Sequence, residues 1–192
     1  MTMVLFISVI AFSGCKKGED DPGISFRSRT ARFAGDWKLT TMDYTETRTN
    51  NGSTSTYHYT YDGVNITTTS TFGGNSYTDK TVYSLNISTT KDGTYNTTEV
   101  DDGDTSLGTG NWLWVRGNKE QDLEKKEAVL FTSTSNTSNG STETYSGKTN
   151  LDGVVMVLKK LSNKEIVFLF DYTYTNSDGY TYNKVGTQTF VQ

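Results

Sequence analysis

The sequence predicts an all-β protein built from antiparallel strands, and three features of the chain carry that prediction. Asn-Gly and Asp-Gly pairs recur along the chain at spacings that suit consecutive hairpins, because these pairs adopt the positive φ angles of tight hairpin turns. The segments between the pairs alternate apolar and polar residues with period two, as half-buried strands do. Twelve Tyr and nine Phe supply aromatic residues, which favour strands.

The alternation assigns residues to the two faces of each strand. In the first strand Trp37, Leu39 and Thr41 are expected to share one face, and in a late strand Phe168 and Phe170 do. The predicted strands, about ten in number with one assignment in excess, cover roughly residues 35–48, 54–62, 64–72, 77–90, 94–101, 109–116, 127–134, 142–148, 153–161, 165–175 and 180–191. Residues 119–127 are expected to form a helix or a charged loop.

A long antiparallel meander must protect its two edge strands. Closing the sheet into a barrel removes both edges, and a two-sheet sandwich is the alternative. The 192 residues suffice for one domain with a proper core. The net charge of -4, with scattered Lys and Arg, argues against nucleic acid as a partner, which would require a clustered basic face.

The N-terminal residues indicate a lipoprotein signal. The apolar run 3–11 is too short to span a bilayer, which takes about 20 residues, but it has the length of a signal-peptide core. The residues that follow, Phe12-Ser13-Gly14-Cys15, resemble a bacterial lipobox, and Cys15 is the only cysteine in the chain. The resemblance implies that residues 1–14 are a signal peptide and that a lipid on Cys15 anchors the protein to a membrane. The alternative is that residues 3–12 form an ordinary buried strand.

Residues 15–34 are expected to form the lipidated cysteine and a flexible tether that could close in a helical turn. The acidic run Glu19-Asp20-Asp21 is similar to the export signal of Bacteroidota lipoproteins that reach the outer face of the outer membrane. A solvated linker is the alternative. The expected location is therefore the outer membrane, with lipid anchoring, and the acidic run favours exposure at the cell surface.

Four motifs in residues 35–191 resemble the lipocalin-like domains of Bacteroidota lipoproteins. They are Gly35-Asp36-Trp37, Asp92-Gly93-Thr94, Gly110-Asn111-Trp112 and Leu158-Lys159-Lys160-Leu161. The resemblance implies an up-and-down antiparallel β-barrel of about eight to ten strands over residues 35–192. It also implies that Gly35 permits a tight turn into the barrel and that Trp37 plugs one end. True lipocalins pack a late Arg over this Trp, and here no Arg follows Arg116.

Aromatic residues are the best candidates for a binding site. An apolar pocket with hydroxyl groups at its mouth would bind a small hydrophobic or amphipathic ligand, and Tyr and Trp rings also suit stacking on sugars. The candidate lining residues are Tyr83, Trp112, Trp114, Phe168, Phe170, Tyr172 and Tyr174. The alternative is that they form the packed core of a filled barrel. The protein would then be a structural or interaction subunit of an outer-membrane complex, with exposed Tyr and Thr strands or the Asn139 loop as its contact surface.

No pattern in the sequence indicates an enzyme, a metal site or a cofactor. His58 is the only histidine, and neither Gly-x-Ser-x-Gly nor His-Glu-x-x-His occurs. The glycines lie in predicted turns rather than before a helix, which argues against a phosphate-binding loop. The run Asp101-Asp102-Gly103-Asp104 offers oxygens to Ca²⁺ but lacks the EF-hand spacing, so a turn is the simpler interpretation. We expect a non-enzymatic protein without a cofactor.

Overall fold

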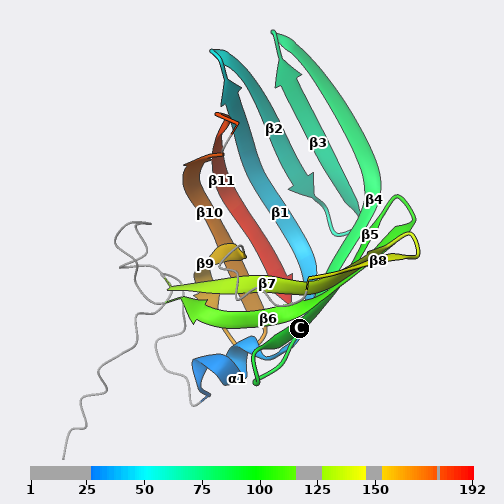
Figure 1. The fold of residues 1–192 in the computed structure, drawn as a ribbon, viewed down its shortest axis with the longest axis vertical. Coiled ribbons are helices and arrows are strands. Elements are labelled where there is room, and N and C mark those ends of the chain that lie inside the picture. Colours follow the sequence, from blue (N-terminus) through cyan, green and yellow to red (C-terminus); the bar gives the residue numbers. More distant parts are fainter. Residues whose placement is uncertain (1–26, 116–126, 146–152, 177) are drawn as a thin grey trace, which may run out of the picture.

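The computed structural model describes residues 27–115, 127–145, 153–176 and 178–192 (Figure 1). The elements in these ranges are α1 (Arg29–Phe33), β1 (Gly35–Asn50), β2 (Ser53–Tyr61), β3 (Asn65–Phe72), β4 (Asn75–Thr89), β5 (Thr94–Asp101), β6 (Asp104–Val115), β7 (Glu127–Ser138), β8 (Ser141–Thr144), β9 (Val154–Leu161), β10 (Glu165–Thr175) and β11 (Thr181–Val191). The predicted signal peptide, Cys15 and the acidic run lie outside the described residues. Among the described residues, no helix has the length and apolarity needed to cross a membrane.

Ten of these strands close into one antiparallel barrel, as predicted. Each of β1 to β6 pairs with the next strand along the chain, and β6 pairs with β7. The ring continues from β7 to β9, β10 and β11, and β11 pairs with β1. Strand β8 stands outside the ring and pairs with the end of β7. This up-and-down topology is consistent with a lipocalin-like fold, and the sandwich alternative is wrong.

The two ends of the barrel are built differently. Near α1, residues 35–38 of β1 pair directly with residues 86–89 of β4, so that β2 and β3 are bypassed there. Farther along, the β2–β3 hairpin is inserted between β1 and β4 and widens the sheet. In Figure 1 the far halves of β1 to β4 rise together with β10 and β11, away from α1, while β5 to β8 extend sideways. We call the α1 end of the barrel the base.

Tight turns connect the hairpins where the sequence places Asn-Gly and Asp-Gly pairs. Both residues of Asn51-Gly52, Asp102-Gly103 and Asn139-Gly140 have positive φ angles. Two consecutive positive φ angles define the type I′ turn, whose twist matches that of the flanking strands. These turns explain why most strand boundaries lie within a few residues of their predicted positions. Two differ more: β6 begins at Asp104 instead of residue 109, and β8 is Ser141–Thr144 where 142–148 was predicted.

The base holds the apolar core. Its side chains come from α1 and from most strands of the ring, and they are almost completely shielded from solvent; among them are Phe33, Trp37, Leu39, Trp112, Val129, Leu158, Leu161, Ile166, Phe168 and Phe190. The rings of Phe33 and Trp112 meet edge to face at 4.7 Å, and Phe168 and Phe190 do so at 5.7 Å. Edge-to-face contacts of this kind add to the free energy gained by burial alone.

Helix α1 covers the base within the segment for which the sequence predicts a flexible tether. Ser28 caps the helix by accepting a hydrogen bond from the backbone N–H of Ala31 at 3.1 Å. Phe33, at the end of the helix, is 1% exposed. Its carbonyl oxygen accepts a hydrogen bond from Nε1 of Trp37 at 2.8 Å. The helix therefore packs on Trp37 at the base of the barrel.

A bulge in β1 corrects one face assignment. The register between β1 and β11 shifts between Leu39 and Thr41, and such a bulge moves all later side chains of the strand to the opposite face. Trp37 and Leu39 face inward as predicted, but Thr41 is exposed and Met42 is buried in its place. Residues 119–126 of the predicted helix lie outside the described residues, and Glu127 begins β7.

Candidate functional site

The predicted pocket residues divide between two regions of the barrel interior. Trp112, Trp114 and Phe168 belong to the base, where the two tryptophan rings contact Phe33 at 4.7 and 5.5 Å. Phe170, Tyr172 and Tyr174 lie farther along β10, and Tyr83 lies across the barrel on β4. The structure therefore does not gather all of these residues around one pocket.

Among the described residues, the gap between the side chains of the base is too small for a ligand. A narrow gap remains between side chains from α1, β1, β4, β7, β10 and β11, and it cannot hold one water molecule. The side chains around it are Phe33, Trp37, Ile87, Thr89, Phe131, Ile166, Phe168 and Phe190. At the base, Trp112, Trp114 and Phe168 therefore form a packed core, which was the alternative to a ligand pocket for these residues.

Beyond the base, the inward face carries tyrosines and ionic side chains instead of aliphatic ones. Cross-strand pairing places Tyr44 between Tyr59 and Gly186, Glu46 between Tyr57 and Lys184, and Arg48 beside Tyr182. We call this surface the tyrosine face, and its residues are Tyr44, Glu46, Arg48, Tyr57, Tyr59, Phe170, Tyr172, Tyr174, Tyr182 and Lys184.

Glu46 is the charged centre of the tyrosine face. The residue is 8% exposed, and its carboxylate accepts hydrogen bonds from Nε of Arg48 at 2.6 Å and lies 3.2 Å from Nζ of Lys184. Burial by itself would raise the pKa of Glu46, but the two cations outweigh that effect and hold the pKa below its usual value. Glu46 is therefore ionised at neutral pH and fixes both cations in place.

Both cations also lie over aromatic rings. Nζ of Lys184 is 4.7 Å from the ring centre of Tyr44 and 5.3 Å from that of Phe170. The guanidinium of Arg48 is 4.5 Å from the ring of Tyr57 and 5.7 Å from that of Tyr182. Such cation–π contacts stabilise a partly desolvated cation by about 0.5–2 kcal/mol. Each cation thus has one carboxylate and two rings as neighbours, which restricts its motion.

Gly186 allows the rings of the tyrosine face to close over β11. It lies between Tyr44 and Phe170 in the sheet, with φ +144°, and a Cβ atom at this position would collide with backbone atoms of Asp43 and Tyr44. The rings of Tyr44 and Phe170 approach to 5.0 Å. Aromatic side chains that cover a strand glycine in this way compensate for its missing side chain.

The outer part of the tyrosine face is a continuous row of rings, in which Tyr172, Tyr174 and Tyr180 are exposed and Tyr182 is partly buried. Tyr174 and Tyr182 stack almost in parallel, with ring centres 4.8 Å apart and an interplanar angle of 8°. Tyr172 follows at 6.1 Å from Tyr174, and Tyr180 lies 6.3 Å from Tyr182. Tyr174 is 50% exposed. Burial and neighbouring charge raise the pKa values of Tyr172 and Tyr174, so their hydroxyls are protonated donors at neutral pH.

Tyr83 forms a separate polar group on the opposite wall. Its hydroxyl donates to Glu99 at 2.7 Å, and its carbonyl oxygen accepts a hydrogen bond from the hydroxyl of Tyr61 at 3.0 Å. Burial is the main cause that raises the pKa of Tyr83, and the contact with Glu99 raises it further. Tyr83 is therefore engaged in fixing β4 to β2 and β5.

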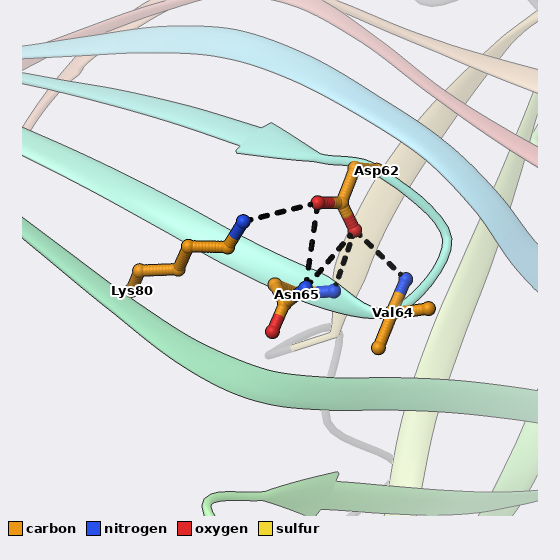
Figure 2. Close-up of polar contacts among 4 residues, drawn as sticks. All are labelled: Asp62, Val64, Asn65 and Lys80. Carbon is orange, nitrogen blue, oxygen red and sulfur yellow. Dashed lines mark hydrogen bonds and ion pairs between the residues drawn. The ribbon is translucent and has the colours of Figure 1, made fainter.

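The β2–β3 hairpin, which carries one side of the tyrosine face, is held at its base-side turn by Asp62. Figure 2 shows its carboxylate accepting hydrogen bonds from the backbone N–H groups of Val64 and Asn65, at 3.0 and 2.7 Å, while Nζ of Lys80 on β4 lies 3.3 Å away. The backbone hydrogen bonds, that of Asn65 first, lower the pKa of Asp62 to about 2. The turn is thereby fixed to the adjacent strand.

The remaining candidates for chemistry lie on turns or outer faces. His58 contacts Asp43 at 2.9 Å on the outside of the barrel. Asp101 accepts a hydrogen bond from Thr81 at 3.1 Å, and Asp102 occupies a hairpin turn. In the described ranges, no three His, Cys, Asp or Glu side chains are placed to hold a metal ion.

Comparisons with protein-family models and with curated protein sequences found no match to this chain. The tyrosine face therefore has to be interpreted from its own geometry.

The sequence predicts Phe170, Tyr172 and Tyr174 as site residues, but it does not predict Glu46, Arg48 and Lys184. A signal for them is present: Glu46 and Arg48 continue the alternation that begins at Tyr44, and Lys184 is two residues from Tyr182. Charged residues that alternate with tyrosines at every second position of a strand lie on the same face as the tyrosines, and they indicate an aromatic face that contains ion pairs. The bulge near Thr40 conceals that phase, because it separates these residues from Trp37 and Leu39.

Proposed function

We propose that this protein is a non-enzymatic, lipid-anchored binding module of the bacterial cell envelope. Its ligand is amphipathic and lies on the tyrosine face, against the tyrosine rings, with its polar groups toward the hydroxyls and cations. The observation that carries this proposal is the exposure of Tyr172 and Tyr174, on the inward side of a barrel whose base is fully packed. Solvent-exposed rings clustered beside ordered polar groups are typical of ligand sites.

Native mass spectrometry tests ligand binding on the full chain, purified from a bacterial envelope in mild detergent. We expect a reproducible additional mass on the wild type that is lost in Tyr174→Ala. The matched control is Tyr145→Ala, because Tyr145 is equally exposed at 50% but follows β8, away from the tyrosine face. A wild type that always carries the mass of the lipoprotein alone would contradict the proposal.

The anchoring part of the proposal rests on the lipobox resemblance and is tested separately. Changing Cys15 to Ala should move the protein from the membrane fraction to the soluble fraction, because the lipid attachment atom is removed. The barrel itself should be unaffected, which circular dichroism would check. A variant that stays in the membrane fraction with unchanged processing would contradict anchoring through Cys15.

One observation favours a second candidate function, that of an assembly subunit. Within the described residues β8 pairs with β7 alone, and all four of its residues are exposed. A strand with one free edge can receive a strand from another protein. A photo-crosslinking residue at Thr142 should then capture one stoichiometric partner on intact membranes, and the same residue at Lys80 should not. Failure to capture such a partner would remove this candidate.

A further inference from the structure

We infer that the tyrosine face binds an acidic saccharide, with a sugar carboxylate on Arg48 and sugar rings on Tyr174 and Tyr182. This inference rests on the proposed binding function and specifies the chemistry of its ligand. Three observations carry it: the orientation of the Arg48 guanidinium, the charge balance around Glu46, and the exposed tyrosines beside both.

Arg48 presents an unused hydrogen-bonding edge. Its Nε is bonded to Glu46, and its guanidinium carbon lies 4.5 Å from the ring centre of Tyr57 and 5.7 Å from that of Tyr182. Within the described residues no hydrogen bond engages either Nη group, and 40% of the side chain is exposed. Two parallel N–H donors in a fixed plane match the two oxygens of a carboxylate. The binding geometry for such a group therefore exists before the ligand arrives.

The charge at this place favours one negative group on the ligand. Arg48 and Lys184 contribute two positive charges and Glu46 one negative charge, so the triad carries a net charge of +1. The chain as a whole carries -4. An anion is thus attracted to the triad against the general charge of the protein, and a neutral ligand gains nothing from it.

The rings next to Arg48 fit a saccharide. Tyr182 lies under the guanidinium and stacks on Tyr174, so that the cation and two ring systems are contiguous. Tyr180 and Tyr172 extend the row on either side. A pyranose ring has an apolar C–H face that packs on a tyrosine ring and hydroxyls at its edge for the phenol groups. The row of rings offers this contact to more than one sugar unit.

An acyl-chain acid fits less well. A fatty acid on Arg48 needs an apolar space for its chain, and the gap between the packed side chains of the base cannot hold a single water molecule. The chain would remain on a surface of tyrosines with polar edges. The structure therefore favours a ligand whose rings lie flat on that surface.

Isothermal titration calorimetry on the full lipidated chain in detergent tests the inference with defined probes. The acidic probes are oligosaccharides of galacturonate and of glucuronate, and the neutral probe is the fully methyl-esterified oligogalacturonate, which keeps the same rings. We expect at least one acidic probe to bind, and its affinity to fall about tenfold or more on esterification, because charge-assisted hydrogen bonds are lost. Equal affinity for acid and ester, or no binding of any acidic probe, would overturn the inference.

Arg48→Lys is the decisive variant, because it keeps the charge beside Glu46 but removes the planar pair of donors. Its binding of the acidic probe should fall about tenfold with little change in melting temperature. Tyr174→Ala should weaken binding as well, and the controls Lys91→Ala, at an exposed lysine of the β4–β5 turn, and Tyr145→Ala should leave it unchanged. An Arg48→Lys variant that binds like the wild type would overturn the role of Arg48.

A titration with laurate separates the two proposals. Binding of laurate that depends on Tyr174, without binding of any acidic saccharide, would overturn the saccharide and leave the proposed binding function standing. A wild type that binds neither probe class and carries no additional mass in native mass spectrometry would overturn both.

Discussion

The base and the tyrosine face share strands β1, β10 and β11, yet their inward side chains are chemically different. At the base β1 contributes Trp37 and Leu39, and nine residues farther along it contributes Glu46 and Arg48. The base excludes water through ring-on-ring packing, whereas the tyrosine face keeps charges in place and leaves rings exposed. Burial of apolar area supplies most of the free energy of folding. The packed core that stabilises the fold and the proposed binding surface therefore lie at opposite ends of one sheet.

We expect the largest difference between the base and the tyrosine face from Trp37→Ala. Trp37 is 2% exposed and touches the helix that covers the base, so its removal should lower the free energy of unfolding by about 3–5 kcal/mol. Tyr174→Ala is the matched change on the tyrosine face and should cost no more than about 1 kcal/mol. Chemical denaturation measures both values. Similar costs for the two variants would mean that the two regions do not differ in their contribution to stability.

Gly186→Ala tests the point at which the tyrosine face depends on backbone geometry. A Cβ atom there meets the backbone of Tyr44 and requires φ +144°, so we expect a loss of about 1–3 kcal/mol in the free energy of unfolding. Gly179→Ala is the control, because Gly179 also has positive φ but no atom lies within 4 Å of its added Cβ. The result expected from denaturation curves is a clearly larger loss at position 186. An equal loss at both would show that only the φ angle matters.

Glu46→Gln probes the ionic centre of the tyrosine face. Removing the charge weakens the contacts to Arg48 and Lys184, and we expect a loss of about 1–2 kcal/mol at pH 7. Because the pKa of Glu46 is lower in the folded than in the unfolded chain, its stabilising effect is complete above the unfolded pKa of about 4.3. The effect is lost as the pH falls through the lower, folded pKa. Melting temperatures of wild type and variant should therefore converge in acid.

The exposed residue Glu143, which accepts a hydrogen bond from Tyr145 after β8, provides the control. At pH 7 and in acid alike, Glu143→Gln should have nearly the same melting temperature as the wild type. Wild-type and Glu46→Gln curves that stay parallel down to the lowest pH would show that the Glu46 carboxylate does not stabilise the fold.

The smallest effect is expected at Asp62, on the turn that fixes the β2–β3 hairpin. Its pKa of about 2 means that the carboxylate remains ionised and holds the Asn65 amide until the pH falls below the ordinary range. NMR titration of the Asn65 amide should report a midpoint near 2, and Asp62→Asn should abolish that titration without a change in the overall fold. A midpoint close to the ordinary Asp value of about 3.9 would contradict the hydrogen bonds of Figure 2.

Much of the fold could be predicted because its information is local. Turns such as Asn51-Gly52 and Asn139-Gly140 need positive φ angles that few residue types adopt, so they limit the strands from sequence alone. The alternation of Tyr57, Tyr59 and Tyr61 likewise predicts their common face correctly. Helix α1 was harder to predict from the sequence, because five residues carry little periodic signal and the position of the helix depends on the burial of Phe33.

Only part of the candidate site could be predicted from the sequence. Tyr172 and Tyr174 could be named as ring-bearing residues of one face, but their separation from Trp112 and Phe168 depends on where along the barrel each strand is paired. Glu46 and Arg48 were missed because the bulge in β1 reverses the inward phase between Leu39 and Met42. The pairing register depends on two strands together and cannot be derived from the sequence of either strand alone.

The all-β character of the chain, the positions of its hairpin turns and most of its core residues follow from local sequence, because turn chemistry and side-chain alternation act over a few residues. The pairing of β6 with β7 that closes the ring, the packing of α1 on the base, and the contacts of Glu46 with Arg48 and Lys184 are features of the tertiary structure. These features join residues up to about 140 positions apart. Their physical origin is the registry of strands and the filling of a shared interior, which exist only once the chain is folded.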